Sequence, residues 1–402
     1  MHVLIAPDRF AGADTDSTDS TTSTDFTGAD GTRRIGAALV AGWLRGATHD
    51  TVDLCPLSDG GPGFAGLLAQ ACGWAPPDAD GVLGVAGART AYIDSAVALA
   101  ASSQDGSAPV AAQIERAIAA GATRIVVGLG TPTDLPGLPD AGAGLLAALG
   151  VRGLGARGLG GEAPRPDGLG EVLDRLRGID LVAATATDIP LLGLHGASAG
   201  AADAGASTRE AAQQREREIG RVADALWQAR ERARAASPSA GLLALAPAQA
   251  VMVTPRARDL TALPGAGAGG GLGFALALLG ARLLPGATVY AQVVGLTARA
   301  QSADLVITAR EDLDGASFHG SGVEQAALAA SGYGIACVAL AERSMMNRRE
   351  LAAVGLSASY PLRPDGAGSQ RAESVEARAG AVAERVARSW SPSWSGAAPG
   401  PS

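Results

Sequence analysis

The chain has 402 residues, and its composition is 47% hydrophobic but only 3% aromatic. A chain of this length is too long for a single domain with one ordinary hydrophobic core, so we expect two domains. A core of Ala, Val, Leu and Ile suits a sheet covered by Ala-rich helices. The net charge of −8 argues against a general nucleic-acid binder, because such a protein needs a basic face.

All 32 basic residues are arginines, and lysine is absent. A genomic bias towards GC-rich codons is sufficient to explain this absence, but its chemical consequence holds regardless of the cause. The sequence excludes a Walker A P-loop and the lysine-dependent site of protein kinases. Arginine stays protonated, so it can bind phosphate but cannot act as a general base.

The cysteines and the apolar segments indicate a cytoplasmic protein. Cys55, Cys72 and Cys337 are odd in number and lack metal-ligand spacing, so we expect them to be reduced. The N-terminus "MHVLIAPD" has no basic region of the kind that begins a signal peptide. The uncharged stretch 260–281 contains Pro264 and a run of glycines, which argues against a membrane span.

Short apolar runs alternate with segments of helical periodicity along the chain. The strands are expected at 2–6, from 51, and at 90–100, 124–130, 180–188, 250–253, 287–294, 304–308 and 335–341. The helices are expected at about 32–45, 63–73, 110–120, 140–150, 208–236, 274–284, 320–331 and 371–389. This alternation implies a largely parallel, layered α/β fold.

Three segments have compositions of their own. Residues 13–30 are rich in Asp, Ser and Thr and cannot bury a core, and the tail 391–402 is rich in Ser, Pro and Gly, so we expect both to be disordered. The charged helix at 208–236 has a seam of Ile219, Val222 and Leu226. This pattern favours a solvated helix packed on one side over an arm that binds nucleic acid.

Several strand ends share one format, in which a short apolar strand is followed by Gly and Asp. They are Asp8, "SDGG" at 58–61, "GLGTPTD" at 128–134, "TATD" at 185–188 and "DLVITAREDLDGASFHG" at 304–320. A single Asp in this position is usually a helix cap or a turn residue. Five such strand ends at the same edge of parallel sheets would form an acidic cleft. Such a cleft can bind Mg²⁺ together with nucleotide phosphates, or it can supply a carboxylate base that deprotonates a hydroxyl group.

A glycine loop at 265–273 matches G-x-G-x-x-G. No strand directly precedes it and no acidic residue lies near position 290, so a dinucleotide-dependent oxidoreductase is disfavoured. Bare backbone N–H groups before a helix could bind phosphate, or the loop could be a tight connection between packed helices. His319 stands alone, and no zinc site or Ser-His-Asp arrangement can be inferred.

In chain order, the sequence resembles the bacterial glycerate kinase family in "VLIAPDRFAG", "LSDGGPG", "RIVVGLG", "DAGAGLLAALG", "TATDIPLLGLHGAS", "LPGAGAGGGLG" and "ADLVITAREDLDG". The resemblance implies two three-layer α/β domains, one of them Rossmann-like, with an active-site cleft between them. The Rossmann-like domain would comprise 1–80 and 285–390, and the second domain 81–284. The resemblance also implies transfer of the γ-phosphoryl group of ATP to D-glycerate with the help of Mg²⁺. The favoured product is 2-phosphoglycerate rather than 3-phosphoglycerate.

The resemblance assigns roles to particular residues. Asp8, Asp188 and Asp314 would be catalytic, and Asp188 and Asp314 would hold Mg²⁺ or activate the substrate hydroxyl. The residues expected to bind substrate or phosphates are Arg9, Asp59, Gly60, Gly130, Asp140, Gly265, Gly267, Gly269, Gly270 and Arg310. The partners would be ATP and a small hydroxy acid, with no nucleic acid or membrane, and the sequence does not indicate an oligomeric state.

The sequence departs from the family pattern in three loops, at 9–12, 131–140 and 309–312. Arg9-Phe10-Ala11-Gly12 replaces a Ser-Phe-Lys-Gly pattern, and Arg310 stands where a Glu is expected. Arg310 would either reverse a charge beside the metal or bind the γ-phosphate in place of the lost lysine. The alternative function is a catalytically weakened homologue that binds nucleotide or a small hydroxy acid as a sensor or partner protein.

Overall fold

Two sheets organise the chain in the computed structural model, which describes residues 1–10, 28–85, 87–101, 106–131, 140–154, 164–203, 205, 207–236, 257–363 and 374–391. The chain divides into two units, Met1–Asp59 with Tyr290–Ser402 and Gly60–Val289. Each unit contains a five-stranded, predominantly parallel sheet with helices on it, which confirms the predicted α/β class with two domains. The domain boundaries suggested by the sequence, after 80 and 284, remain a proposal.

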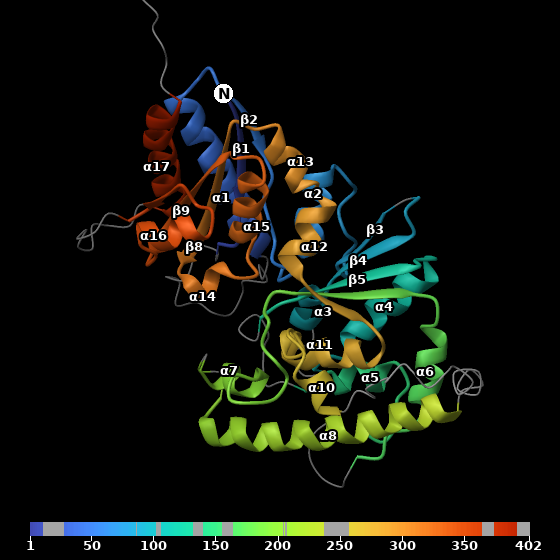
Figure 1. The fold of residues 1–402 in the computed structure, drawn as a ribbon. Helices are drawn as coiled ribbons and strands as arrows, with labels where there is room; N and C mark the ends of the chain where they lie inside the picture. The colour runs from blue at the N-terminus through green and yellow to red at the C-terminus, as the bar shows by residue number, and fades with distance from the viewer. Residues whose placement is uncertain are drawn as a thin grey trace, which may run out of the picture. The chain divides into compact units, whose positions relative to one another are not determined.

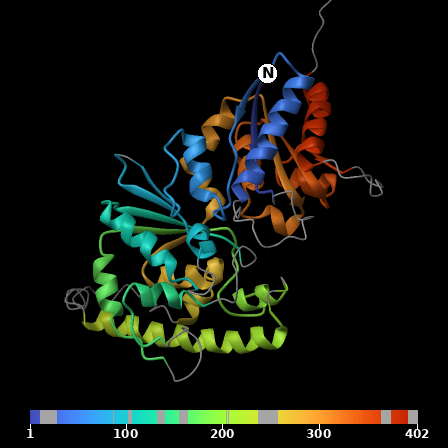
Figure 2. The same ribbon diagram turned by 180° about the vertical axis from the view of Figure 1, so that it is seen from behind.

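The first unit is built on a parallel sheet with the strand order β10-β9-β8-β1-β2. Its elements are β1 (His2–Pro7), α1 (Gly28–Gly46), β2 (Thr51–Leu54), α13 (Leu296–Gln301), β8 (Leu305–Leu313), α14 (Gly315–Phe318), α15 (Gly322–Ser331), β9 (Ala336–Ser344), α16 (Arg348–Ala353), β10 (Ala358–Pro361) and α17 (Val375–Trp390). Helices α1 and α17 lie side by side on one face, and α15 covers the other (Figures 1 and 2). This unit therefore has three layers.

Strand β1 lies inside this sheet, because Val3 pairs with Val52 of β2 and with Leu305 of β8. Alternate side chains of these strands face α1 and α17. Val3, Leu305 and Trp43 belong to one buried cluster on that face. The short apolar runs that the sequence predicted as strands thus form the centre of the core.

The second unit has the strand order β3-β4-β5-β6-β7, in which only the β3–β4 pair is antiparallel. Its elements are α2 (Phe64–Cys72), β3 (Val82–Val85), β4 (Thr90–Asp94), α3 (Ser95–Ala101), α4 (Pro109–Ala119), β5 (Arg124–Leu129), α5 (Ala143–Ala148), α6 (Leu169–Arg175), β6 (Asp180–Thr185), α7 (Ala197–Asp203), α8 (Arg209–Ala236), α10 (Ala257–Thr261), α11 (Ala268–Leu278) and β7 (Arg282–Pro285). Helix α12 (Gly286–Val293) runs across the division between the units.

Helices cover both faces of this second sheet. Helix α2 packs on β3 and β4, while α4, α5 and α11 lie on the opposite face, with α8 as an outer helix beyond them (Figure 1). Ile219, Val222 and Leu226 of α8 are buried, which confirms the predicted seam of this charged helix. The exposed face of α8 carries most of its charged side chains.

Three sequence predictions differ from the structure. The expected strand at 287–294 is helix α12, where Ala287, Tyr290 and Val294 are buried at the helical spacing of three and four residues. Its β-branched and aromatic residues favour a strand locally, but the burial of one helical face decides the outcome. The segment 90–100 is not one strand, because it turns from β4 into α3 at Ser95.

The third difference is that β8 does not end at residue 308. It continues to Leu313, because Arg310 pairs with Ala341 and Asp312 with Arg343 on β9. The side chains of Asp312 and Arg343 also form an ion pair along this extension, with N–O distances of 2.6 and 2.8 Å. The expected charged loop is therefore partly a strand.

Some elements were not predicted, and some predictions lie outside the described residues. Strands β3, β7 and β10 are short and lack strong patterns, and β7 lies within the helix that was expected at 274–284. Gly28–Asp30, at the end of the segment expected to be disordered, begin α1. The expected strand at 250–253, the rest of 13–30 and residues 392–402 lie outside the described residues. Among the helices that are described, none is long and apolar enough to cross a bilayer.

Helices α1 and α17 approach each other closely through glycines. A Cβ atom at Gly42 would lie 2.1 Å from the carbonyl oxygen of Gly380, and one at Gly46 would lie 2.4 Å from that of Glu384. Real Cβ atoms do not approach this closely, so the two helices could not keep their separation with larger residues. Glycine at these positions therefore sets the thickness of this layer.

We predict that Gly42→Ala lowers the free energy of unfolding by about 2 kcal/mol, because α1 and α17 must separate to accept the methyl group. Gly220→Ala in α8 is the matched control, since its Cβ would meet only Leu192, at 3.9 Å. There the same change should raise the stability by about 0.5 to 1 kcal/mol through helix propensity. Urea unfolding of both variants measures the difference, and equal effects would contradict the packing argument.

Candidate active site

Asp8 directly follows β1 and is fully buried at the carboxyl end of the first sheet. Its backbone N–H donates to the carbonyl of Ala309 at 2.7 Å, which fixes its position beside β8. Its Oδ2 accepts a hydrogen bond from Nη1 of Arg310 and another, at 3.0 Å, from the N–H of Gly322. Its Oδ1 is buried and has no partner among the residues that the structure describes.

The guanidinium of Arg310 is mostly buried, with 18% of its side chain exposed. Burial alone would lower its pKa, but the carboxylates of Asp8 and Asp59 outweigh burial and raise the pKa above the ordinary arginine value. The sequence left two roles open for this residue, beside a metal or on a phosphate. In the structure its guanidinium is bound to Asp8, and its contact with phosphate remains a prediction.

Asp59 and Arg9 complete a charged cluster with Asp8 and Arg310. Asp59 is 5% exposed, and its Oδ2 lies 4.0 Å from Nη1 of Arg9. We call these four residues the Asp8 cluster. It contains two carboxylates and two guanidiniums, so its formal charges cancel. Such a cluster lies where parallel α/β sheets bind ligands, beyond the carboxyl ends of the strands.

Asp314 follows the extended strand β8 and is half-buried. Its carbonyl oxygen accepts the N–H of Phe318 at 3.1 Å, so it begins the short helix α14. Its predicted role in catalysis and metal binding remains a prediction.

In the second unit, the glycine loop forms a buried left-handed turn. Gly269, Gly270 and Gly271 have φ values of 60°, 64° and 99°, so the regular right-handed part of α11 begins after them. The N–H of Gly267 donates to Ile189 and that of Gly269 donates to Gly130, both at 3.0 Å. These two N–H groups are therefore not bare, contrary to the expectation for a phosphate nest.

The same glycines allow close contacts with neighbouring loops. A Cβ at Gly267 would lie 2.4 Å from the carbonyl oxygen of Pro190, and one at Gly265 would lie 2.8 Å from the side chain of Thr185. A Cβ at Gly271 would lie 2.5 Å from Cα of Ala141. The loop thus joins the segments that follow β5 and β6, and the roles of Gly265 and Gly270 in phosphate binding remain predictions.

Asp140 organises the start of α5. Its Oδ1 accepts the N–H of Gly142 at 2.8 Å, and its Oδ2 accepts the N–H of Gly144 and both the N–H and the hydroxyl of Ser107. The neighbouring Ala141 has a φ of 58°, which is uncommon outside glycine. The structure thus gives Asp140 a capping role, and its predicted contact with substrate or phosphate stays untested.

Gly60, Gly130 and Asp188 lie at the strand ends of this unit. Gly60 has a φ of 100°, and a Cβ there would lie 2.6 Å from the carbonyl oxygen of Ala184 on β6. Gly130 follows β5 and is buried. Asp188 is exposed in the loop after β6, so its carboxylate is accessible to a ligand.

Asp94 was missed by the sequence analysis. It ends β4, is 3% exposed, and accepts the N–H of Gly63 at 2.7 Å and that of Ala96 at 3.2 Å. Burial raises the pKa of its carboxyl to about 6, although these N–H groups and that of Val97 lower it. Its place at the end of a strand is the signal that could have found it, had 90–100 not been read as one strand.

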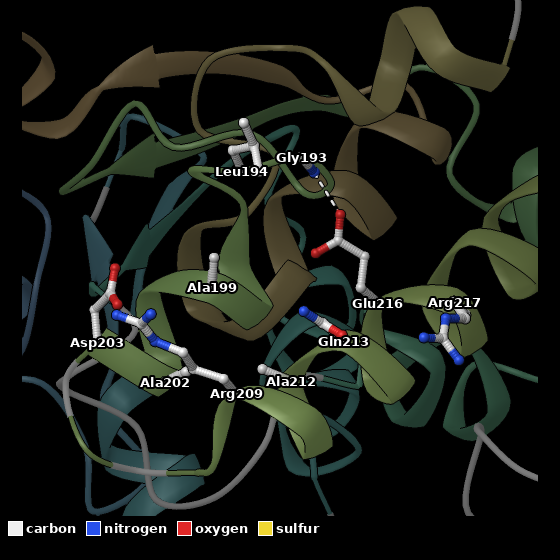
Figure 3. Close-up of a pocket in the computed structure, with 10 residues that line it drawn as sticks. All are labelled: Gly193, Leu194, Ala199, Ala202, Asp203, Arg209, Ala212, Gln213, Glu216 and Arg217. Atoms are coloured by element: carbon white, nitrogen blue, oxygen red, sulfur yellow. Dashed lines mark hydrogen bonds between the residues drawn. The ribbon is translucent and has the colours of Figure 1, made fainter.

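A pocket of about 690 Å³ lies between α7 and α8 (Figure 3). Glu216 of α8 accepts a hydrogen bond of 2.7 Å from the N–H of Gly193. Gly193 belongs to the loop that also carries Asp188, so this bond ties the loop to α8. No predicted site residue lines this pocket, and no sequence pattern indicated it.

Comparison with known proteins decides the family. The model of the glycerate kinase family matches residues 22–391, nearly the whole chain. The chain belongs to the glycerate kinase family. Two uncharacterized mycobacterial proteins, from Mycobacterium bovis and Mycobacterium tuberculosis, are each 27% identical over 391 residues, which cover 90% of this chain and 84% of each relative.

The fold agrees with this membership. The crystal structure of a proposed glycerate kinase 2 from Salmonella typhimurium LT2 has a TM-score of 0.61 to this chain at 23% identity, covering 97% of this chain and 98% of that protein. At this identity the likeness concerns the fold alone. Family membership implies a phosphotransferase of the kinase type.

In this member of the glycerate kinase family, the structure brings together only some of the predicted residues. Asp8, Arg9, Asp59 and Arg310 form one cluster in the first unit. Gly130, Gly267 and Gly269 meet in the second unit, with Gly265 and Gly270 in the same loop and Asp188 in the loop that contacts it. Asp188 belongs to the second unit and Asp314 to the first, so the predicted magnesium pair remains a prediction.

Within the described ranges, no three His, Cys, Asp or Glu side chains are grouped so that they could hold a metal ion. Magnesium in kinases is usually held by one or two carboxylates together with substrate phosphates and water. The exposed carboxylate of Asp188 and the half-buried carboxylate of Asp314 are oxygen ligands of the kind that Mg²⁺ takes, and their part in a magnesium site stays a prediction.

We predict a distinctive pH dependence from Asp94. A carboxyl group with a pKa of about 6 in the folded protein and 3.8 as its ordinary value binds its proton more tightly when folded. The free energy of unfolding should therefore fall as the pH rises from about 4 to about 6, by about 3 kcal/mol at about 1.4 kcal/mol per pKa unit.

In Asp94→Asn this fall should disappear, because residue 94 no longer titrates. Urea unfolding of both proteins between pH 4 and pH 7 measures the difference in slope. Parallel curves for the native protein and the variant would show that Asp94 does not titrate in this range.

Proposed function

We propose that this chain is an ATP-dependent glycerate kinase that transfers the γ-phosphoryl group of ATP to a hydroxyl of D-glycerate. The observation that carries the proposal is the Asp8 cluster, in which two buried carboxylates lie with two guanidiniums, that of Arg310 mostly buried, at the carboxyl ends of β1, β2 and β8. Phosphoryl transfer depends mostly on positioning and charge stabilisation, which a fixed charged cluster supplies. The 2-hydroxyl is the favoured acceptor by the family resemblance.

The remaining residues have roles that fit this reaction. Asp188 and Asp314 would hold Mg²⁺, which neutralises phosphate charge when bound, or would activate the substrate hydroxyl, and Asp8 would be the third catalytic carboxylate. The predicted contacts of Gly60, Gly130, Asp140, Gly265, Gly267, Gly269 and Gly270 with substrate or phosphates belong to this proposal. Among the glycines of the loop, Gly267 and Gly269 would have to act without their N–H groups, which are already donated.

One observation favours the second candidate function. Because Arg310 is already bound to Asp8, a carboxylate that could act on substrate has a protein cation beside it. A homologue with weakened catalysis that still binds nucleotide or a small hydroxy acid would tolerate this pairing. Such a protein would act as a sensor or a partner protein.

The experiment that tests the proposal measures ADP release from the purified protein with Mg-ATP, with and without D-glycerate. We expect release to depend on glycerate, and we expect Asp188→Asn to lower it by roughly a hundredfold or more, as for loss of a catalytic acid–base group. Asp188 is exposed, so its replacement should leave the melting temperature unchanged. Phosphorus NMR of the product distinguishes 2-phosphoglycerate from 3-phosphoglycerate.

Asp174→Asn is the matched control, because Asp174 is an exposed carboxylate of the same unit and is paired with Arg177. It should keep full turnover. Absence of turnover in the native protein, with ATP or glycerate still raising its melting temperature, would reject the kinase and support the binding protein.

A further inference from the structure

The two oxygens of the Asp8 carboxylate have different surroundings. Oδ2 accepts two hydrogen bonds, whereas the buried Oδ1 accepts none from the residues that the structure describes. A carboxylate oxygen that is removed from water without a donor is costly, so native proteins rarely keep one without a reason. Oδ1 therefore has an unused capacity to accept a hydrogen bond at the ligand-binding edge of the sheet.

Gly322, the first residue of α15, lies against this carboxylate. A Cβ there would lie 2.9 Å from Cγ and from Oδ1 of Asp8, and 2.9 Å from Cβ of Leu57. Only glycine therefore lets the N-terminus of α15 bring an N–H group to Oδ2 while Oδ1 stays where it is. Ser321 caps the same helix by accepting the N–H of Glu324 at 3.2 Å, which fixes the turn that presents Gly322.

Arg310 holds the carboxylate from the neighbouring strand. Its backbone is fixed by the pairing of β8 with β9, and its guanidinium reaches Oδ2 rather than Oδ1. A charge-assisted hydrogen bond of this kind is stronger and more directional than a neutral one. Both donors thus bind the same oxygen and leave the other one buried and without a donor among the described residues.

We infer that Arg310 and Gly322 are positioning residues that orient Asp8 so that its Oδ1 accepts a hydrogen bond from the acceptor hydroxyl of the substrate. This inference rests on the proposed function and names the contact that recognises the substrate. An ionised carboxylate attracts a donor and repels an anion. The hydroxy acid of the proposed function would therefore enter with its hydroxyl towards Asp8 and its own carboxylate away from it.

The test measures binding to the full-length protein by calorimetry, with Mg²⁺ and a non-hydrolysable ATP analogue present. The ligands are D-glycerate, D-lactate, which lacks the 3-hydroxyl, and 3-hydroxypropanoate, which lacks the 2-hydroxyl. With the 2-hydroxyl as the favoured acceptor, the native protein should bind glycerate about ten- to a hundredfold more tightly than 3-hydroxypropanoate, which lacks the hydroxyl that faces Asp8. In Gly322→Ala this ratio should fall to about one, while the affinity for that analogue stays the same.

Gly332→Ala is the matched control at the other end of α15, where a Cβ would meet its nearest atom, the carbonyl oxygen of Leu328, at 3.6 Å. It should keep the native ratio. A change in overall stability alone would weaken all ligands together, so the ratio separates positioning from folding. A native ratio in Gly322→Ala would overturn the inference.

Arg310 provides the second test, which holds even if Gly322→Ala fails to fold. Arg310→Met should lose the discrimination between glycerate and its analogue, and Arg310→Lys, which keeps a cation, should recover part of it. Equal loss in both variants would overturn the role of the charge.

The outcomes separate the inference from the proposed function. Glycerate binding without turnover would reject the kinase alone, whereas turnover with unchanged binding ratios in the variants would reject the inference alone. Absence of glycerate binding by the native protein would reject both.

Discussion

A buried carboxylate at the end of a parallel strand needs donors, and in this chain glycine N–H groups at helix starts supply them. Gly322 donates to Asp8 and Gly63 to Asp94, and Gly142 donates in the same way to the half-buried Asp140 before α5. Gly322 begins α15, and Gly63 and Gly142 directly precede α2 and α5, so the positive terminus of a helix faces each carboxylate. Burying these charges is possible only because the backbone comes close enough, which requires a residue without a side chain.

This constraint accounts for the buried carboxylates at the strand ends. In both units, hydrogen bonds between such carboxylates and glycine N–H groups hold the starts of helices beside the strand ends. A core that is poor in aromatic residues fits the same plan, because thin layers bring backbones close together. The Asp8 cluster differs from the other two sites in having a guanidinium as well as an N–H group.

The sequence predicted the α/β class and the place of Asp8 after a buried strand because both depend on local patterns, while the catalytic role of Asp8 stays a prediction. Apolar runs of strand length are visible without knowledge of their neighbours, and so is an Asp that directly follows one. Asp94 was missed because the helix after it is as apolar as the strand before it. The helical form of Tyr290 and its neighbours depends on burial of one face, which only the folded chain shows.

Partners that are distant in sequence could not be predicted either. The sequence predicted that Arg310 lies beside a metal or binds a phosphate. Neither prediction included an ion pair with Asp8, which lies 302 residues away in the sequence. The glycine loop raised the same difficulty. Its pattern fits both a phosphate nest and close packing, and the acceptors of Gly267 and Gly269 come from other loops.

The order of strands in the first sheet has a consequence for the synthesis of this protein. Strand β1 leaves the ribosome about 300 residues before its neighbour β8. At about 5 to 20 residues per second, this interval lasts roughly 15 to 60 seconds. During that time β1 has only β2 to pair with, while the whole of the second unit emerges and can fold first. The nascent chain thus carries an apolar strand with one open edge, which can be paired only after β8 has been synthesised.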